Sequence, residues 1–386
     1  MSKTRIVVKI FIPFILFFLF FFELFSFISS KLNLLIFNNT PKIYLQESKF
    51  SVATEWRDEK NIWGAWHKID FQQSHQSDCF DVIYKTNNIG ARDAKFSINE
   101  KKIKKTFILL GDSMMEGYGL NKDEMFENII EKENNLNVLN FASGGDFGPL
   151  QYHLIYQNMA KNFKHDGIIL VYFPQNDLTD NNYEIWKNNG WNKFNDLERH
   201  RPYSIYKNNG YNHFIPVGAK KSDHFQYEVN ERRYQMIKFL INYTWSANSL
   251  RTLLYLYRSV GRKNQNGNIY KDTNYSSFYD FNKNLLDENI YWMKSIFKNS
   301  TNLENYLIIL PSKNDMKTHN KYKNQNNIAK ELMAKFDSET YSNLNIINLI
   351  NYLPNDYEKI LLKCDDHYSF YGNQWISNIF KKYKKR

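Results

Sequence analysis

The chain is poor in cysteine, with only Cys79 and Cys364 among 386 residues. Two cysteines exclude a cysteine-rich zinc site. They could form one disulfide if both lie outside the cytosol, and two buried thiols are the alternative. The sequence also lacks internal repeats and any proline- or serine-rich linker. Although the formal net charge is +11, no dense Arg/Lys tract is interleaved with aromatics, so the pattern does not favour nucleic-acid binding.

One long apolar run stands at the N-terminus, from Ile10 to Ile28, with only three non-apolar interruptions. Its length matches a membrane span, and the basic residues before it predict a cytoplasmic N-terminus. A cleaved signal peptide is the alternative, but no small-x-small cleavage site follows. We therefore expect residues 1–30 to be a cytoplasmic tip and signal anchor of a single-pass inner-membrane protein. The remaining chain would be extracytoplasmic, which in a Gram-negative cell is the periplasm.

Residues 31–100 form a lead-in extension before the main domain. Several tryptophans cluster around Gly64, and the alternating stretch Cys79–Lys85 predicts a half-exposed strand. We expect these aromatics to pack the extension onto the main domain rather than to bind a ligand.

From residue 101 to 386 the chain alternates short buried strands with helix-length segments. This rhythm predicts an α/β domain with a parallel sheet and right-handed crossovers. The expected strands are Phe107–Leu110, Asn137–Phe141, Gly167–Phe173, Tyr306–Leu310 and Leu344–Leu349. The expected helices are Lys122–Lys132, Leu150–Asn162, Leu285–Lys298, Asn327–Phe336 and Tyr371–Lys382.

The rhythm is interrupted by a long insertion at about 181–284. Insertions of this length inside an α/β domain are functional or form a small subdomain. Its aromatics could make a lid or a sugar-stacking wall, or could simply pack the subdomain. The residues concerned are Trp186, Trp191, Tyr203, Tyr206 and Tyr211.

Four polar segments follow buried strands or precede the last helix. They are Gly111-Asp112-Ser113, Asn140–Gly148, Phe173–Asp177 and Cys364–Gly372. The carboxyl ends of parallel strands meet at one edge of a sheet, where open α/β folds bind ligands. We therefore expect the four segments to converge.

Together these segments supply the groups that acyl transfer needs. Ser113 would be the nucleophile and His367 its base, with an aspartate fixing the imidazole tautomer. The amides of Ser113 and Gly145 and the side chain of Asn176 would surround the oxyanion. No metal or organic cofactor is implied.

At these positions the sequence resembles the SGNH hydrolases, also called GDSL-type esterases. The matching positions are Gly111-Asp112-Ser113, Gly145, Asn176-Asp177 and Asp365/His367, in the family's order. The resemblance implies a three-layer, flavodoxin-like fold with Ser113 as nucleophile and amide donor, Gly145 and Asn176 as oxyanion donors, and His367 as base.

The sequence departs from the family pattern at two places. Pro174 stands where the pattern has a glycine, and Cys364 occupies the usual position of the acid, three before the histidine. Asp365, two before His367, is our first choice for the triad acid. Asp366 is adjacent to the histidine and would have to bend back, so it is the second choice.

Each segment also has a plainer interpretation. Asn176-Asp177 could cap a helix, and Gly144-Gly145 could be only a turn. The Asp365–His367 stretch could cap the last helix or form an isolated metal pair, although a third ligand at recognisable spacing is missing. Their joint occurrence in the family's order favours the enzyme.

We therefore expect a membrane-anchored serine ester hydrolase or O-acyltransferase that forms an acyl-serine intermediate. An acylated envelope or extracellular carbohydrate is the expected substrate. The alternative is a non-catalytic envelope scaffold or glycan-binding protein that retains the fold. The sequence does not indicate an oligomeric state.

Overall fold

The computed structural model describes residues 3–32, 57–77, 79–94, 96, 104–144, 147–188, 201–216, 236, 239–240, 243–250, 253 and 276–384. The chain divides into two compact units. One contains residues 1–50 and 227–272, and the other contains 51–226 and 273–386. This division differs from the predicted one. The extension from residue 51 belongs to the larger unit, and part of the predicted insertion groups with the N-terminal residues.

A five-stranded sheet forms the centre of the larger unit, in the order β11-β10-β7-β5-β6. Its strands are β5 (Thr106–Leu110), β6 (Asn137–Asn140), β7 (Gly167–Tyr172), β10 (Glu304–Ile309) and β11 (Leu344–Asn348). All four neighbouring pairs are parallel. The five strands lie within a residue or two of the predicted ranges. In chain order the arrangement is 2-1-3-4-5, which places a topological switch point between β5 and β7, where doubly wound sheets bind ligands.

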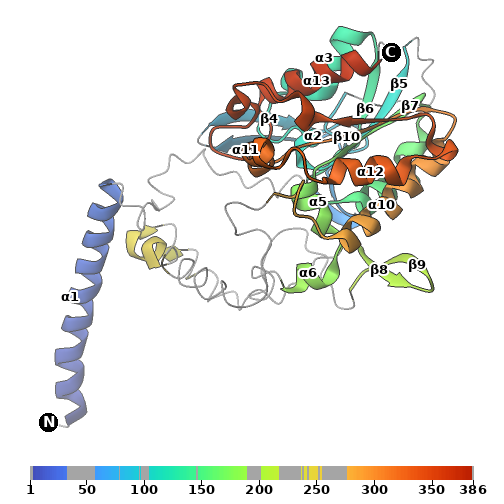
Figure 1. Cartoon of the computed structure of the whole chain (residues 1–386). Helices are drawn as coiled ribbons and strands as arrows, with labels where there is room; N and C mark the ends of the chain where they lie inside the picture. Colours follow the sequence, from blue (N-terminus) through green and yellow to red (C-terminus); the bar gives the residue numbers. More distant parts are fainter. Residues whose placement is uncertain are drawn as a thin grey trace. The chain divides into compact units, whose positions relative to one another are not determined.

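Helices cover both faces of this sheet (Figure 1). On one face lie α3 (Phe126–Asn134) and α13 (Phe370–Lys384), whose apolar side chains pack against Phe107 and Leu109 of β5. On the other face lie α4 (Pro149–Asn158), α10 (Lys283–Phe297) and α12 (Ile328–Phe336), packed against Ile108 and Leu110. Alternate residues of a strand point to opposite faces, so a strand covered on both faces is apolar throughout.

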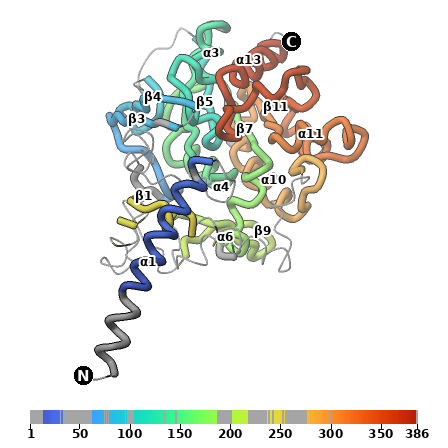
Figure 2. The backbone as a smooth tube through the Cα atoms, turned by 90° about the vertical axis from the view of Figure 1, so that its left-hand side faces the viewer, coloured from blue at the N-terminus to red at the C-terminus, as the bar shows by residue number. Residues whose placement is uncertain are grey.

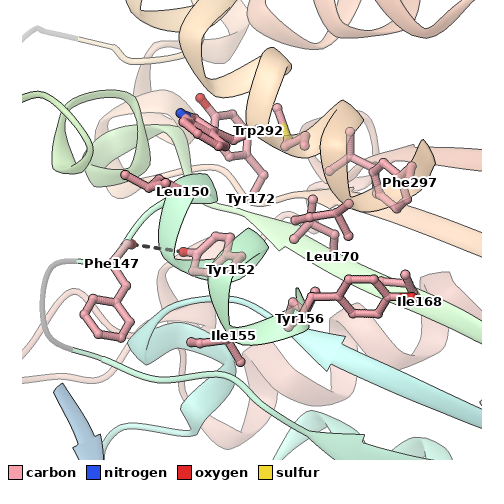
Figure 3. Packing of buried hydrophobic residues seen from close by; sticks show 14 of the residues in the cluster. Phe147, Leu150, Tyr152, Ile155, Tyr156, Ile168, Leu170, Tyr172, Trp292 and Phe297 are labelled. Atoms are coloured by element: carbon pink, nitrogen blue, oxygen red, sulfur yellow. Dashed lines mark hydrogen bonds between the residues drawn. The ribbon is translucent and has the colours of Figure 1, made fainter. Parts of the chain in front are cut away.

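Figure 3 shows the core between β7, α4 and α10. Ile168 and Leu170 of β7 lie beside Ile155 of α4, and all three are fully buried. The Tyr152 hydroxyl donates to the Phe147 carbonyl oxygen at 3.1 Å, so a buried polar group is satisfied close to the carboxyl edge of the sheet.

The remaining helices and turns of this unit are short. They comprise α2 (Ser113–Glu116), the 3₁₀ turns Lys122–Glu124, Ala160–Asn162 and Lys298–Ser300, α5 (Pro174–Asp180), α6 (Tyr183–Asn188), α11 (Lys313–Tyr322), and the 3₁₀ turns Glu339–Tyr341, Leu349–Tyr352 and Tyr357–Ile360. The sequence did not predict α2, α5, α6 or α11. The first three have only four, seven and six residues, too few to show an apolar stripe.

The extension contributes two antiparallel hairpins to the larger unit (Figure 2). They are β1 (Arg57–Asn61) with β2 (Gly64–His67), and β3 (Gln72–Ser77) with β4 (Phe80–Lys85). Trp63 and Trp66 enter the main core, as the sequence predicts. Cys79, just before β4, forms a disulfide with Cys364. The extension is therefore bonded covalently to the segment that carries the candidate histidine.

A further hairpin, β8 (Tyr203–Lys207) with β9 (Gly210–Phe214), lies in the predicted insertion. Tyr203 is fully buried and packs against the Arg201 guanidinium and Trp186, so these residues form a small packed cluster. Tyr206 and Tyr211 form a separate ring pair, with Tyr206 64 % exposed. Trp191 lies outside the described residues. The packing alternative therefore holds for part of the predicted aromatic wall.

The smaller unit contains α1 (Lys3–Lys31), which includes the predicted membrane segment. The Glu23 carboxylate accepts hydrogen bonds from the amides of Trp245 and Ser246, at 2.7 and 2.9 Å. It therefore caps the helical residues 245–250, and the Phe27 ring packs edge-on against Trp245. Within the part of the chain that the structure describes, none of the helices has the length and apolar character needed to cross a membrane. The predicted membrane span at residues 10–28 stays a prediction.

Candidate active site

The candidate nucleophile stands in a sharp turn at the carboxyl end of β5. Asp112 is the N-cap of α2, and its carboxylate accepts a hydrogen bond from the Met114 amide at 3.0 Å. Ser113 is the first residue of this one-turn helix. Gly117 ends the helix with a φ of 80°, a conformation that favours glycine. These local constraints hold Ser113 at the edge of the sheet.

Ser113, His367 and Asp365 form a continuous hydrogen-bonded chain. The Ser113 Oγ lies 2.7 Å from the His367 Nε2, and the His367 Nδ1 lies 2.5 Å from the Asp365 Oδ1. A carboxylate can only accept, so Nδ1 carries the proton and Nε2 is left to accept the serine hydroxyl proton. This is the tautomer that a general base requires.

The second-choice acid, Asp366, does not contact the His367 ring. Its carboxylate forms an ion pair with Lys313 at 3.1 Å, and both side chains are about half exposed. Asp365 instead accepts from both the backbone amide and the ring of His367, at 2.9 and 2.5 Å. The two-residue spacing lets the chain fold back in a tight turn, which adjacent residues cannot do.

Asp365 and Asp112, the two acids near the serine, have pKa values shifted in opposite directions. Partial burial would raise the pKa of Asp365, but the hydrogen bond and charge of His367 outweigh burial and lower it. Asp112 is completely buried, and desolvation raises its pKa despite hydrogen bonds from Asn176 and Met114. Asp365 thus remains ionised beside the histidine, as a partner of an imidazolium should.

Asn176, in the first turn of α5, lies on the other side of Asp112. Its Nδ2 donates to the Asp112 Oδ2 at 3.0 Å. Its Oδ1 is buried and has no hydrogen-bond partner within the described chain. The adjacent Asp177 has a structural position: its Oδ2 accepts from the Phe173 amide at 2.7 Å, and its Oδ1 lies 2.8 Å from the Tyr152 hydroxyl oxygen. Gly145, the other predicted oxyanion donor, lies outside the described residues.

The histidine loop, residues 361–369, is held from several sides. Leu361 and Tyr368 form an antiparallel bridge, and the Tyr368 hydroxyl donates to the Pro311 carbonyl at 2.8 Å. The ring of Tyr118 stacks on the His367 ring at 4.1 Å between centroids. The Cys79–Cys364 disulfide joins the loop next to the candidate acid. These contacts fix a base that stands on an otherwise irregular segment.

Three residues near the site were not singled out from the sequence: Tyr118, Glu116 and His67. Tyr118 stacks on the candidate base, and Glu116 forms a 2.7 Å ion pair with His67 of the extension. Glu116 lies three residues after Ser113, and this short spacing is the signal in the sequence that could have indicated a residue near the site. Among the described residues, no group of three or more His, Cys, Asp and Glu side chains is placed to hold a metal ion.

No family model matches the sequence, and no curated protein matches it. Among solved structures, a lipase from a goat rumen metagenome shares 11% identity, with a TM-score of 0.34 over 72% of this chain and 97% of its own. A lipase/acylhydrolase from Enterococcus faecalis shares 10% identity, with a TM-score of 0.36 over 72% and 93%. A family two carbohydrate esterase from Clostridium thermocellum shares 8% identity, with a TM-score of 0.36 over 74% and 65%. TM-scores of this size carry no functional weight, so the function proposed below rests on the geometry of Ser113, His367 and Asp365.

Proposed function

We propose that the protein is a serine ester hydrolase or O-acyltransferase that forms an acyl-serine intermediate. The observation that carries the proposal is the Ser113–His367–Asp365 chain, with contacts of 2.7 and 2.5 Å. His367 takes the serine proton while the Ser113 Oγ attacks the ester carbonyl carbon. It then returns that proton to the leaving alkoxide as the acyl-serine forms. Water, or an acceptor hydroxyl, then attacks the acyl-serine by the reverse path.

We assign oxyanion stabilisation to the Asn176 side chain, beyond β7, together with backbone amides beside the serine. Asn176 is fixed by Asp112, whose neighbour is the nucleophile itself. An amide held in this way can donate to developing charge without reorganising, which is the main source of its effect. The Ser113 and Gly145 amides are proposed as the other two donors.

The experiment is hydrolysis of p-nitrophenyl acetate by the purified chain, together with labelling by a serine-directed fluorophosphonate. The S113A variant should lose both reactions. Ser338 lies exposed before β11, at the opposite edge of the sheet, so S338A should retain both. A folded wild-type protein that neither hydrolyses the ester nor takes the label would point to the non-catalytic scaffold instead.

We also propose that the site works in an oxidising compartment outside the cytoplasm. The Cys79–Cys364 disulfide supports this, because such bonds persist mainly in secreted and periplasmic proteins. Alkylation of the protein from intact cells, with and without prior reduction, tests the point. Free thiols at both positions in the native protein would contradict it.

Attachment to a lipid bilayer through α1 is proposed on separate grounds. The described part of this helix exposes many large apolar side chains, among them Phe14, Phe18 and Phe25, each more than half exposed. Such side chains favour contact with lipid over water. Co-flotation of the full chain with liposomes, lost on removal of residues 1–31, would support attachment. Equal flotation of both would refute it.

We also propose an acylated envelope or extracellular carbohydrate as the substrate, an inference from the proposed compartment and from the resemblance to SGNH hydrolases rather than from a binding motif. Transfer and hydrolysis are separated by adding acetylated donors with candidate oligosaccharide acceptors. Acylated oligosaccharide detected by mass spectrometry would establish transfer, whereas release of free acetate alone would establish hydrolysis.

A further inference from the structure

A buried carboxylate lies directly behind the candidate nucleophile. Glu116 is the last residue of α2, and its side chain is 2 % exposed. Its Oε2 accepts a hydrogen bond from the Gly144 amide at 2.5 Å, and its Oε1 lies 2.7 Å from the Nε2 of His67. One carboxylate therefore joins three segments that are far apart in sequence.

The hydrogen bonds of His67 determine where the protons lie. Its Nδ1 is 2.8 Å from the Gly90 carbonyl oxygen, which can only accept, so Nδ1 carries a hydrogen. One further proton then lies between Nε2 and the Glu116 Oε1. The side chain of His67 is fully buried. Both groups are thus satisfied, as buried polar groups must be.

The extension also holds the backbone of the same turn. The Arg92 guanidinium donates to the carbonyl oxygens of Glu116 and Gly117, and its Nη2 donates to Leu120. The Tyr84 hydroxyl accepts from the Gly119 amide at 2.9 Å. The turn that carries Ser113 therefore cannot shift without disturbing the extension.

The Gly144 amide is the last of a series of anchored amides that lead away from β6. The Ala142 amide donates to the Asn140 side chain at 2.9 Å, and the Ser143 amide donates to the Gly111 carbonyl at 3.1 Å. The next amide, that of Gly144, donates to the Glu116 carboxylate. The residue that follows Gly144 is the predicted oxyanion donor. Backbone donors are effective only when their position is fixed before the reaction.

We infer that Glu116, held by His67, is a positioning residue that fixes the Gly144 peptide relative to Ser113. This inference rests on the proposed ester chemistry. It adds a structural link between the extension and the segment after β6 that carries the predicted oxyanion donor. Glu116 acts through geometry and not through charge. A glutamine at 116 can still accept from Gly144 and donate to a neutral His67 Nε2, so it should preserve the arrangement.

The test compares full-length E116L, E116Q and wild type, with E288L as the matched control. Glu288 is another buried glutamate, 6 % exposed, that lies on α10 and does not contact the nucleophile turn. E116L should lower kcat for p-nitrophenyl acetate by about tenfold or more with KM unchanged, since misplaced oxyanion donors act on the transition state. E116Q should remain within about threefold of wild type, and E288L should keep the wild-type kcat.

Hydrogen–deuterium exchange of the segment 141–144 supplies a second readout that does not depend on activity. E116L should exchange faster there than wild type, and E288L should not. If wild type shows no esterase activity, the ester proposal fails while faster exchange in E116L still supports the positioning role. A folded E116L with unchanged exchange overturns the inference.

A further variant covers the case in which E116L does not fold. E116D keeps the charge but is one methylene shorter, so it cannot reach both Gly144 and His67. It should show the same loss of kcat and the same faster exchange. Wild-type kcat and exchange in E116D would overturn the inference.

Discussion

The nucleophile turn, residues 111–120, and the histidine loop, residues 361–369, bring the two reacting side chains together by different means. The turn is buried, and hydrogen bonds to Asp112, Glu116 and neighbouring carbonyls hold it from the core and the extension. The loop is partly exposed: the side chains of His367 and Asp365 are 22 % and 32 % exposed. It is held by the disulfide, by the stacked ring of Tyr118, and by the backbone bridge and buried hydroxyl of Tyr368.

This difference indicates where each region can tolerate change. Many buried contacts hold the serine, so the loss of one affects both folding and geometry. The side chains of Asp365 and His367 are partly exposed, so a substitution at either does little damage to the core. Substitutions of Asp365 should therefore change activity more than stability, whereas loss of the disulfide, or of a buried contact in the nucleophile turn, should lower both.

The largest expected effect comes from the triad acid. D365N should lower kcat/KM by about 10³–10⁴, because an amide no longer fixes the Nδ1–H tautomer of His367. D366N should remain within about twofold of wild type, since it removes only an exposed ion pair with Lys313. Steady-state hydrolysis of p-nitrophenyl acetate measures both. Equal losses in the two variants would show that the choice of Asp365 is wrong.

The second test removes the covalent bond between the extension and the loop. The C79A/C364A variant should lose about 2–4 kcal/mol of unfolding free energy, because the disulfide closes a very long loop in the unfolded chain. Activity should fall as well, since Cys364 is adjacent to Asp365. Urea denaturation and ester hydrolysis measure the two effects, and reduced wild type serves as the comparison. A variant as stable and active as wild type would show that noncovalent contacts suffice to hold the loop.

The third test addresses the ring stacked on the base. Y118L should lower kcat by about tenfold or less, because an aromatic pair contributes about 0.5–1.5 kcal/mol beyond its burial. Y118F keeps the ring and should retain wild-type activity. If both variants lose activity equally, the hydroxyl of Tyr118 is the important group and stacking is not.

The smallest expected effect is the pH dependence of the unfolding free energy. Asp112 in the nucleophile turn and Asp365 in the histidine loop should change it in opposite directions. The raised pKa of Asp112 means that its contribution to stability falls as pH rises above about 4, because the folded state binds the proton more tightly than the unfolded state. The lowered pKa of Asp365 gives a contribution that is present above about pH 4 and is lost as pH falls.

Urea unfolding of D112N and D365N between pH 3 and 7 compares the two signs. D365N should lose less stability than wild type on acidification, by under about 1 kcal/mol given its exposure. D112N should lose less stability than wild type as pH rises. The same sign in both variants would contradict the assigned environments.

The parallel strands could be predicted from the sequence because each is a short apolar run between polar turns, and burial on both faces requires that composition. The placement of Ser113, Asn176 and His367 at one edge follows from the same rule. The choice between Asp365 and Asp366 needed the backbone path of the loop. The partners of Glu116 could not be predicted, because His67 and Gly144 lie far from it in sequence and their approach depends on packing.

The sequence alone determined a parallel α/β sheet with a serine, an asparagine and a histidine at its carboxyl edge. Short apolar runs that alternate with helix-length segments require strands buried on both faces, which is the arrangement of a parallel α/β sheet. Only the tertiary structure decided which aspartate contacts the histidine ring, that Cys79 and Cys364 pair, and that the extension belongs to the larger unit. Each of these depends on contacts between distant segments, which local composition and spacing do not encode.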